Sequence, residues 1–104
     1  MPVVVVATIV PKPAHLEEVA AALQTAVGQV HPEDGCELYA LHRNDERLVM
    51  IEQWSSAETL RVHGRGPALA RLTAALDGLL AGPLDVVMLT AVPAGDPVKG
   101  QLKP

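Results

Sequence analysis

The stretch Arg47–His63, RLVMIEQWSSAETLRVH, decides the fold, because the chain changes there from a strand to a helix. Its first half alternates, which places successive side chains on opposite faces of a strand. Leu48, Met50, Glu52 and Trp54 share one of these faces. Its second half carries apolar residues at helical spacing. The stretch therefore predicts a strand that leads directly into a helix.

The start of this helix is indicated by Ser55 and Glu58, which form the S-x-x-E pattern of a capping box. Helical spacing continues from about Ser56 to Leu80. The glycines and the proline of segment 64–67 interrupt it, and Gly82-Pro83 stops it. We therefore expect a long helix with a kink or a break into two pieces.

Outside this stretch, the sequence predicts three further strands and one further helix. The strands are expected at Val3–Val10, Cys36–Arg43 and Leu84–Val92, and the helix at Pro13–Val30, which has an apolar stripe. The order of elements is β-α-β-β-α-β. It predicts a ferredoxin-like α+β fold, with a four-stranded antiparallel sheet and two helices on one face.

The chain has 104 residues, which fits one domain. We expect this domain to span residues 1–93. A C-terminal tail, residues 94–104, is rich in Gly, Pro and Lys and lacks a core-forming pattern.

The composition is apolar, with 49% hydrophobic and 19% charged residues and a mean hydropathy of +0.24. Strands one, three and four carry apolar residues on both faces, whereas two helices can cover only one face of the sheet. An uncovered apolar face of that size is rare on a soluble monomer. We therefore expect a homodimer through the sheet faces, with two-fold symmetry.

Several classes of function are disfavoured by charge and composition. The net charge of −4, with scattered Lys and Arg, disfavours binding of nucleic acid. The apolar N-terminus is too short to span a bilayer and lacks the features of a signal peptide, so we expect no membrane association and a cytoplasmic location. The single cysteine, Cys36, excludes an intramolecular disulfide and is interpreted as a small buried apolar residue.

His63 is the main candidate for chemistry. It lies three residues after Leu60, on the inner stripe of the second helix, and just before the glycine-rich break. An imidazole can act as a general base near neutral pH. The alternative is a histidine at the edge of the core that bonds to a carbonyl. No metal-ligand spacing occurs around the four histidines, and His15, His31 and His42 are expected to be solvated.

Trp54 and Tyr39 are the only Trp and Tyr, and the chain has no Phe. They are the available platforms for a planar ligand, and their N–H and O–H groups could hold a ligand oxygen. The alternative for Trp54 is ordinary packing.

Glu52 shares its strand face with Trp54. A carboxylate at that place must face solvent, pair with a cation or belong to a site. Arg43, Arg61 and Arg65 are the candidate cations.

Two segments, EDGCELYALH (33–42) and LVMIEQWSSAETLRVHGRGPALARL (48–72), together with the last strand, resemble the antibiotic biosynthesis monooxygenase family of dimeric α+β barrels. The resemblance covers residues 3–92. Its most diagnostic parts are Gly35-Cys36…Tyr39 and Glu52-x-Trp54-x-Ser56…Leu60-x-x-His63.

The resemblance implies a homodimer with packed sheets and a pocket between the helices and the sheet of each subunit. Characterised members include enzymes that oxidise hydroxylated aromatics, such as anthrones and quinols, with O₂ and without metal, flavin or other cofactor. Another branch degrades haem, using an Asn, a Trp and a His. Those positions align with Ala7, His63 and Leu72, so the haem ligand is missing and haem degradation is rejected.

The favoured hypothesis is therefore a cofactor-independent monooxygenase, with His63 as base and Trp54, Tyr39 and Glu52 around a small aromatic or hydrophobic ligand. The first alternative is a non-catalytic dimer that binds a small hydrophobic molecule, such as a stress-response or regulatory protein, which the scarcity of aromatic residues favours. The second is an isomerase or cyclase, because a fold does not determine a reaction.

Overall fold

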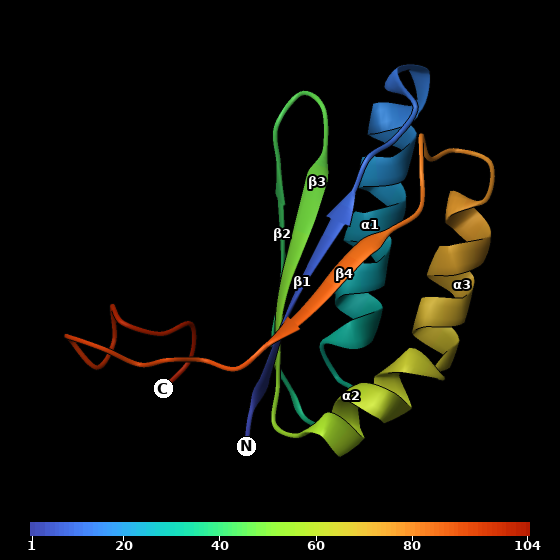
Figure 1. Ribbon diagram of the computed structural model, residues 1–104. Coiled ribbons are helices and arrows are strands. Elements are labelled where there is room, and N and C mark those ends of the chain that lie inside the picture. Colours follow the sequence, from blue (N-terminus) through green and yellow to red (C-terminus); the bar gives the residue numbers. More distant parts are fainter.

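A four-stranded antiparallel sheet with the strand order β2-β3-β1-β4 carries all helices on one face in the computed structural model, which describes residues 1–104 (Figure 1). The strands are β1 (Val3–Ile9), β2 (Cys36–Arg43), β3 (Leu48–Trp54) and β4 (Asp85–Leu89). The ferredoxin-like α+β arrangement predicted from the sequence is confirmed. β4 is shorter at both ends than the predicted strand.

The helical layer follows the predicted pattern, with a full break in the second helix. A 3₁₀ turn, η1 (Pro13–His15), leads into α1 (Leu16–Val30), and the second helical segment divides into α2 (Ala57–Gly64) and α3 (Pro67–Leu76). Gly66 precedes α3 and Pro67 is its first residue, where the missing N–H and the fixed φ of proline are tolerated. None of these helices is both long enough and apolar enough to cross a membrane.

The predicted end of the second helix at Leu80 is wrong. α3 ends at Leu76, because Gly78 adopts a left-handed backbone (φ +77°), which stops a helix. The chain then turns back along the segment that follows β1. The N–H of Lys12 donates to the carbonyl of Leu79 (2.9 Å), and Leu80 forms a β-bridge with Pro11.

The predicted capping box is one residue out of register. Ser56, not Ser55, has the extended backbone of an N-cap, and its hydroxyl accepts from the N–H of Thr59 at 3.1 Å. The Thr59 hydroxyl in turn accepts from the N–H of Ser56 at 3.3 Å. Glu58, which was expected to close the box, instead forms an exposed ion pair with Arg61.

The core lies between the helices and the inner face of the sheet. Its largest fully buried side chains come from α1 and β3, and they are Val19, Leu23, Val30, Leu48, Met50 and Trp54. The predicted inner face of the third strand is therefore confirmed.

The outer face of the sheet is apolar and carries no helix. The strand register places Ala40, Ile51, Val6 and Val87 side by side across the four strands, and we call these residues the outer row. The C-terminal tail lies on this side (Figure 1), where the carbonyl of Lys103 accepts from the side chain of Gln53 at 3.4 Å.

A tight turn before β2 joins the sheet to α2. Gly35 adopts φ +79°, and its carbonyl accepts from the N–H of Ser55 at 2.8 Å. A Cβ at this position would collide with the side chain of Thr59 in α2. Glycine is therefore required by both backbone conformation and space, and the turn brings the preceding residues against α2.

We expect Gly35→Ala to lower the free energy of unfolding by about 1–3 kcal/mol, because it adds a strained backbone and a collision. Gly28→Ala is the matched control. Gly28 lies within α1, and an added Cβ meets nothing within 4 Å. This substitution should raise the free energy of unfolding by about 0.5–1 kcal/mol. Urea unfolding followed by circular dichroism measures both, and effects of the same sign would contradict the prediction.

Candidate functional site

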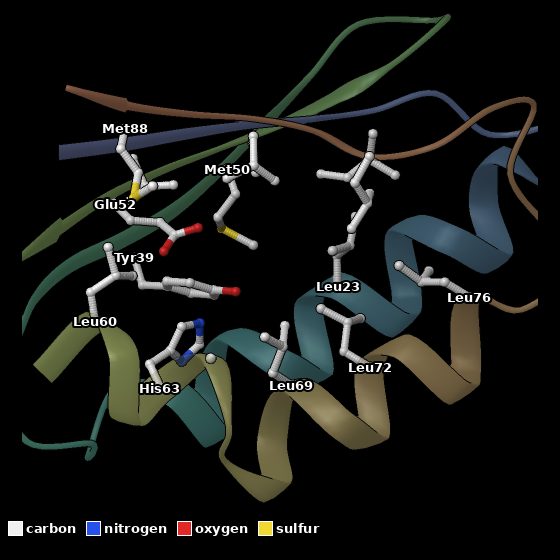
Figure 2. A pocket seen from close by; sticks show the side chains of 16 residues that line it. Leu23, Tyr39, Met50, Glu52, Leu60, His63, Leu69, Leu72, Leu76 and Met88 are labelled. Atoms are coloured by element: carbon white, nitrogen blue, oxygen red, sulfur yellow. The ribbon is translucent and has the colours of Figure 1, made fainter. Parts of the chain in front are cut away.

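A cavity of about 270 Å³ lies between the inner face of the sheet and the helices (Figure 2). Sixteen residues line it, of which 13 are hydrophobic. The ionisable side chains Glu52 and His63 lie together with Tyr39 at one end, whereas Leu72 and Leu76 lie toward the other (Figure 2). The cavity is thus an apolar chamber with one polar end, which is the usual form of a small-molecule site.

His63 lies on α2, is 5% exposed, and directs its ring into the cavity (Figure 2). Its Nδ1 lies 2.7 Å from Oε1 of Glu33. Its Nε2 has no hydrogen bond within the protein. Because no buried side-chain nitrogen or oxygen of the chain lacks a partner, Nε2 must be accessible. The carboxylate of Glu33 thus takes the place of the carbonyl considered as an alternative.

Glu33 was not predicted as a site residue. It lies in the turn before β2, 30 residues from His63, and the left-handed Gly35 folds this turn against α2. The spacing of neighbouring residues in the sequence cannot predict a contact between residues so far apart. The available signal was the Glu33-Asp34-Gly35 turn immediately before the strand that carries Tyr39.

Trp54 supports the site from behind and does not line the cavity. It is fully buried, and its ring stacks on that of His63 with centroids 4.5 Å apart and planes 29° apart. Its Nε1 donates to Oε1 of Glu52 at 2.9 Å. The expectation that Trp54 is a platform for a ligand is therefore replaced by a supporting role toward His63 and Glu52.

Glu52 is buried and lines the cavity, without a cationic partner. Pairing with an arginine, one of the three options for Glu52, is wrong, because Arg43 bonds to Glu17, Arg61 bonds to Glu58 and Arg65 forms no ion pair. Burial raises the pKa of Glu52, and the hydrogen bond from Trp54 offsets this only in part. The carboxyl group therefore keeps its proton to a higher pH than a free glutamate.

Tyr39 faces the cavity from β2. Its hydroxyl has no partner in the protein and points into the cavity (Figure 2). Burial raises the pKa of Tyr39, with a further contribution from the charge of Glu52, so the phenol is neutral. Its ring meets that of His63 edge to face, at a centroid distance of 5.6 Å.

His31 is exposed, as expected, and its Nε2 in addition lies 3.0 Å from the backbone carbonyl of Tyr39. This contact ties the end of α1 to the strand that carries Tyr39. Cys36 is half-buried, and burial raises the pKa of its thiol, which suits an unreactive side chain. His15 is exposed and pairs with Glu18.

A ferredoxin-like domain with an apolar cavity and a histidine–carboxylate pair defines a class of small-molecule-binding domains that includes enzymes. The sequence profile of one such family, antibiotic biosynthesis monooxygenase, matches residues 2–75. The chain belongs to this family. No curated protein matches the chain.

Solved structures agree with this assignment. Rv0793 from Mycobacterium tuberculosis superposes with a TM-score of 0.85 at 28% identity, covering 92% of this chain and 100% of that one. PA3566 from Pseudomonas aeruginosa superposes with a TM-score of 0.81 at 28% identity, covering 88% of this chain and 94% of that one. A candidate antibiotic biosynthesis monooxygenase from Caulobacter crescentus CB15 superposes with a TM-score of 0.81 at 27% identity, covering 88% of this chain and 90% of that one.

We expect Glu52→Gln to stabilise the protein increasingly as pH rises. The pKa of Glu52 is raised above the 4.5 of an ordinary glutamate, so the folded state binds more protons than the unfolded state in that pH range. The wild type therefore loses stability as pH rises from about 4.5 through the folded-state pKa, and the amide does not.

Urea unfolding of Glu52→Gln and wild type between pH 4 and pH 8 measures this difference, which should be smallest at pH 4. Glu46→Gln is the control, since the side chain of Glu46 is 79% exposed. A difference that is constant across the range would show that Glu52 ionises as freely in the folded protein as in the unfolded chain.

Proposed function

We propose that this protein is a monooxygenase that oxidises a hydroxylated aromatic substrate, of the quinol or anthrone type, with O₂ and without a cofactor. The observation that carries the proposal is the imidazole of His63, bonded to Glu33 on one side and open to an apolar cavity on the other. Membership of the antibiotic biosynthesis monooxygenase family supports an oxygen-using reaction.

His63 would act as the general base. The accessible Nε2 accepts the proton of the substrate hydroxyl, and the imidazolium that forms is stabilised by the adjacent carboxylate of Glu33 at 2.7 Å. A carboxylate behind a histidine plays this role in many acid–base sites. The product of this step is an electron-rich aryloxide held in a cavity with few competing polar groups.

Oxidation then follows from the substrate itself. The aryloxide transfers one electron to O₂, and the resulting radical pair combines to form a C–O bond and a peroxide. The peroxide anion takes the proton back from the imidazolium of His63 and loses water, which leaves a new carbonyl, so a phenol and O₂ give a quinone and H₂O. The substrate supplies all the electrons, and the protein contributes orientation, exclusion of water and stabilisation of the anion.

Glu52 and Tyr39 would bind the second oxygen of the substrate. Burial raises the pKa of Tyr39, so its phenol stays protonated and can donate a hydrogen bond, whereas the carboxyl oxygens of Glu52 can accept one. Leu23, Met50 and Leu69 line the cavity beyond this end and would contact the rest of the ring system. The pattern fits a flat, apolar molecule with polar groups at one edge.

Two alternatives have observations in their favour. Tyr39 is the only Phe, Trp or Tyr that lines the cavity, which favours binding of a small hydrophobic molecule without turnover. His63 and Glu52 at one end could also move a proton without oxygen, as in an isomerase or cyclase. Product analysis under anaerobic conditions separates the isomerase or cyclase from the oxygenase.

Oxygen uptake with a panel of anthrones and hydroquinones tests the proposal. Wild-type protein should consume O₂, and His63→Ala should do so at least about 100-fold more slowly, because general-base catalysis contributes that much. His15→Ala is the control, since His15 is exposed and pairs with Glu18. Absence of uptake with every compound, or equal rates for wild type and His63→Ala, would count against this function.

The active form would be a homodimer packed through the outer faces of the two sheets. The outer row is apolar, and Val87 and the neighbouring Leu89 are 43% and 46% exposed in the single chain. Burying such a face against a second copy removes apolar surface from water without a new partner.

Light scattering after size-exclusion chromatography should give twice the chain mass of 11.0 kDa. Ile51→Lys, which places a charge in the outer row, should shift the protein to monomer. Thr73→Lys, at an exposed position of α3 on the opposite side, should leave the dimer intact. A stable wild-type monomer at micromolar concentration would rule out this assembly.

A further inference from the structure

We propose that Glu33 is a positioning residue that holds His63 in the tautomer with the proton on Nδ1, so that the cavity selects ligands by a hydroxyl that donates to Nε2. The inference concerns the same site as the proposed function. It requires no turnover, because the tautomer and the ligand preference are properties of the resting protein.

The tautomer follows from the donor and acceptor roles at the 2.7 Å contact. An ionised carboxylate can only accept hydrogen bonds, so Nδ1 of His63 must be the donor toward Glu33. In the neutral ring the other nitrogen, Nε2, then carries a lone pair and accepts. A ligand must therefore present a hydrogen-bond donor to Nε2.

The ring has little freedom to escape this arrangement. The ring of Trp54 stacks on it with centroids 4.5 Å apart, and the ring of Tyr39 lies edge to face with it at a centroid distance of 5.6 Å. Glu33 is itself held by the turn at Gly35, whose carbonyl is bonded to the N–H of Ser55. The His63 side chain is only 5% exposed, so a flip of the imidazole would leave buried polar atoms unpaired.

The ionisable groups that surround the ring are Glu33 from the turn before β2, Tyr39 from β2 and Glu52 from β3. Among them, only Glu33 forms a hydrogen bond with the imidazole. Glu52 accepts from Trp54 instead, and Tyr39 makes no bond to it. The choice of tautomer therefore rests on Glu33.

The same chain offers a histidine with the opposite assignment. Nε2 of His31 lies 3.0 Å from the carbonyl of Tyr39, and a carbonyl can only accept, so His31 must carry its proton on Nε2. His15 pairs with Glu18 at an exposed site, so burial does not restrict its ring. One spectrum can thus compare two histidines for which the structure assigns opposite tautomers.

Nitrogen-15 NMR of the imidazole rings, recorded at a pH where the rings are neutral, tests the assignment. In wild type, His63 should give the pattern of an Nδ1-protonated ring and His31 that of an Nε2-protonated ring. Glu33→Ala should shift His63 toward the Nε2-protonated form, and Asp34→Asn, at the exposed neighbouring carboxylate, should leave it unchanged. An Nε2-protonated His63 in wild type would overturn the proposal, even if no variant folds.

Ligand selection is tested by calorimetric titration with 1-naphthol and 1-methoxynaphthalene, which share a ring system but differ in the donor. Wild type should bind 1-naphthol about tenfold more tightly, the scale of a lost hydrogen bond to a buried group. Glu33→Gln should retain this preference, because an amide oxygen can also accept from Nδ1. Glu33→Ala should reduce it to about twofold or less.

Equal binding of the two compounds by wild type, or an unchanged preference in Glu33→Ala, would overturn the role given to Glu33. Failure of the oxygenase is a separate result. If the tautomer and the hydroxyl preference are found but no oxygen is consumed, Glu33 positions His63 for binding, and the proposed reaction alone is wrong.

Discussion

The hydrogen bond between Glu33 and His63 joins the turn before β2 to α2, and the shape of the cavity depends on this junction. It forms because Gly35 turns the chain in a way that no other residue type adopts easily, against the capped start of α2. The break before Pro67 then redirects the chain into α3. The cavity lies where these pieces leave space under the sheet.

The buried polar groups of this site form a continuous chain of contacts. Glu33 accepts from His63, the ring of His63 stacks on Trp54, and Trp54 donates to Glu52. The two hydrogen bonds satisfy polar groups whose burial would otherwise cost free energy, and the stacked rings hold the two pairs together. The atoms left without a partner, Nε2 of His63 and the hydroxyl of Tyr39, are those that reach the cavity. The remaining hydrogen-bonding capacity is therefore available to a ligand.

The sequence predicted the order of elements and the inner face of β3, because both depend on local periodicity. Helical spacing put His63 on the inner stripe of its helix and strand alternation put Tyr39 on one face of its strand, and both residues line the cavity in the structure. Glu33 could not be predicted, because its partner lies 30 residues away. The cap at Ser56 was misplaced because two adjacent serines both fit the local pattern, and only the backbone conformation distinguishes them.

Glu52 shows a further limit of spacing arguments. A buried carboxylate usually has a cationic partner, yet here the indole of Trp54, two residues along the same strand face, satisfies it. Strand alternation places those two side chains together, so the contact could have been inferred. The raised pKa of Glu52 could not, because it depends on the helices that exclude water from the inner face.

A crystal structure with 1-naphthol bound is the most direct test of the roles given to His63 and Glu33. The ring system should lie inside the cavity, with the hydroxyl oxygen about 3 Å from Nε2 of His63. The hydrogen bond between Nδ1 and Glu33 should be retained. A naphthol bound with its hydroxyl directed away from His63, or bound only outside the cavity, would show that these roles are wrong.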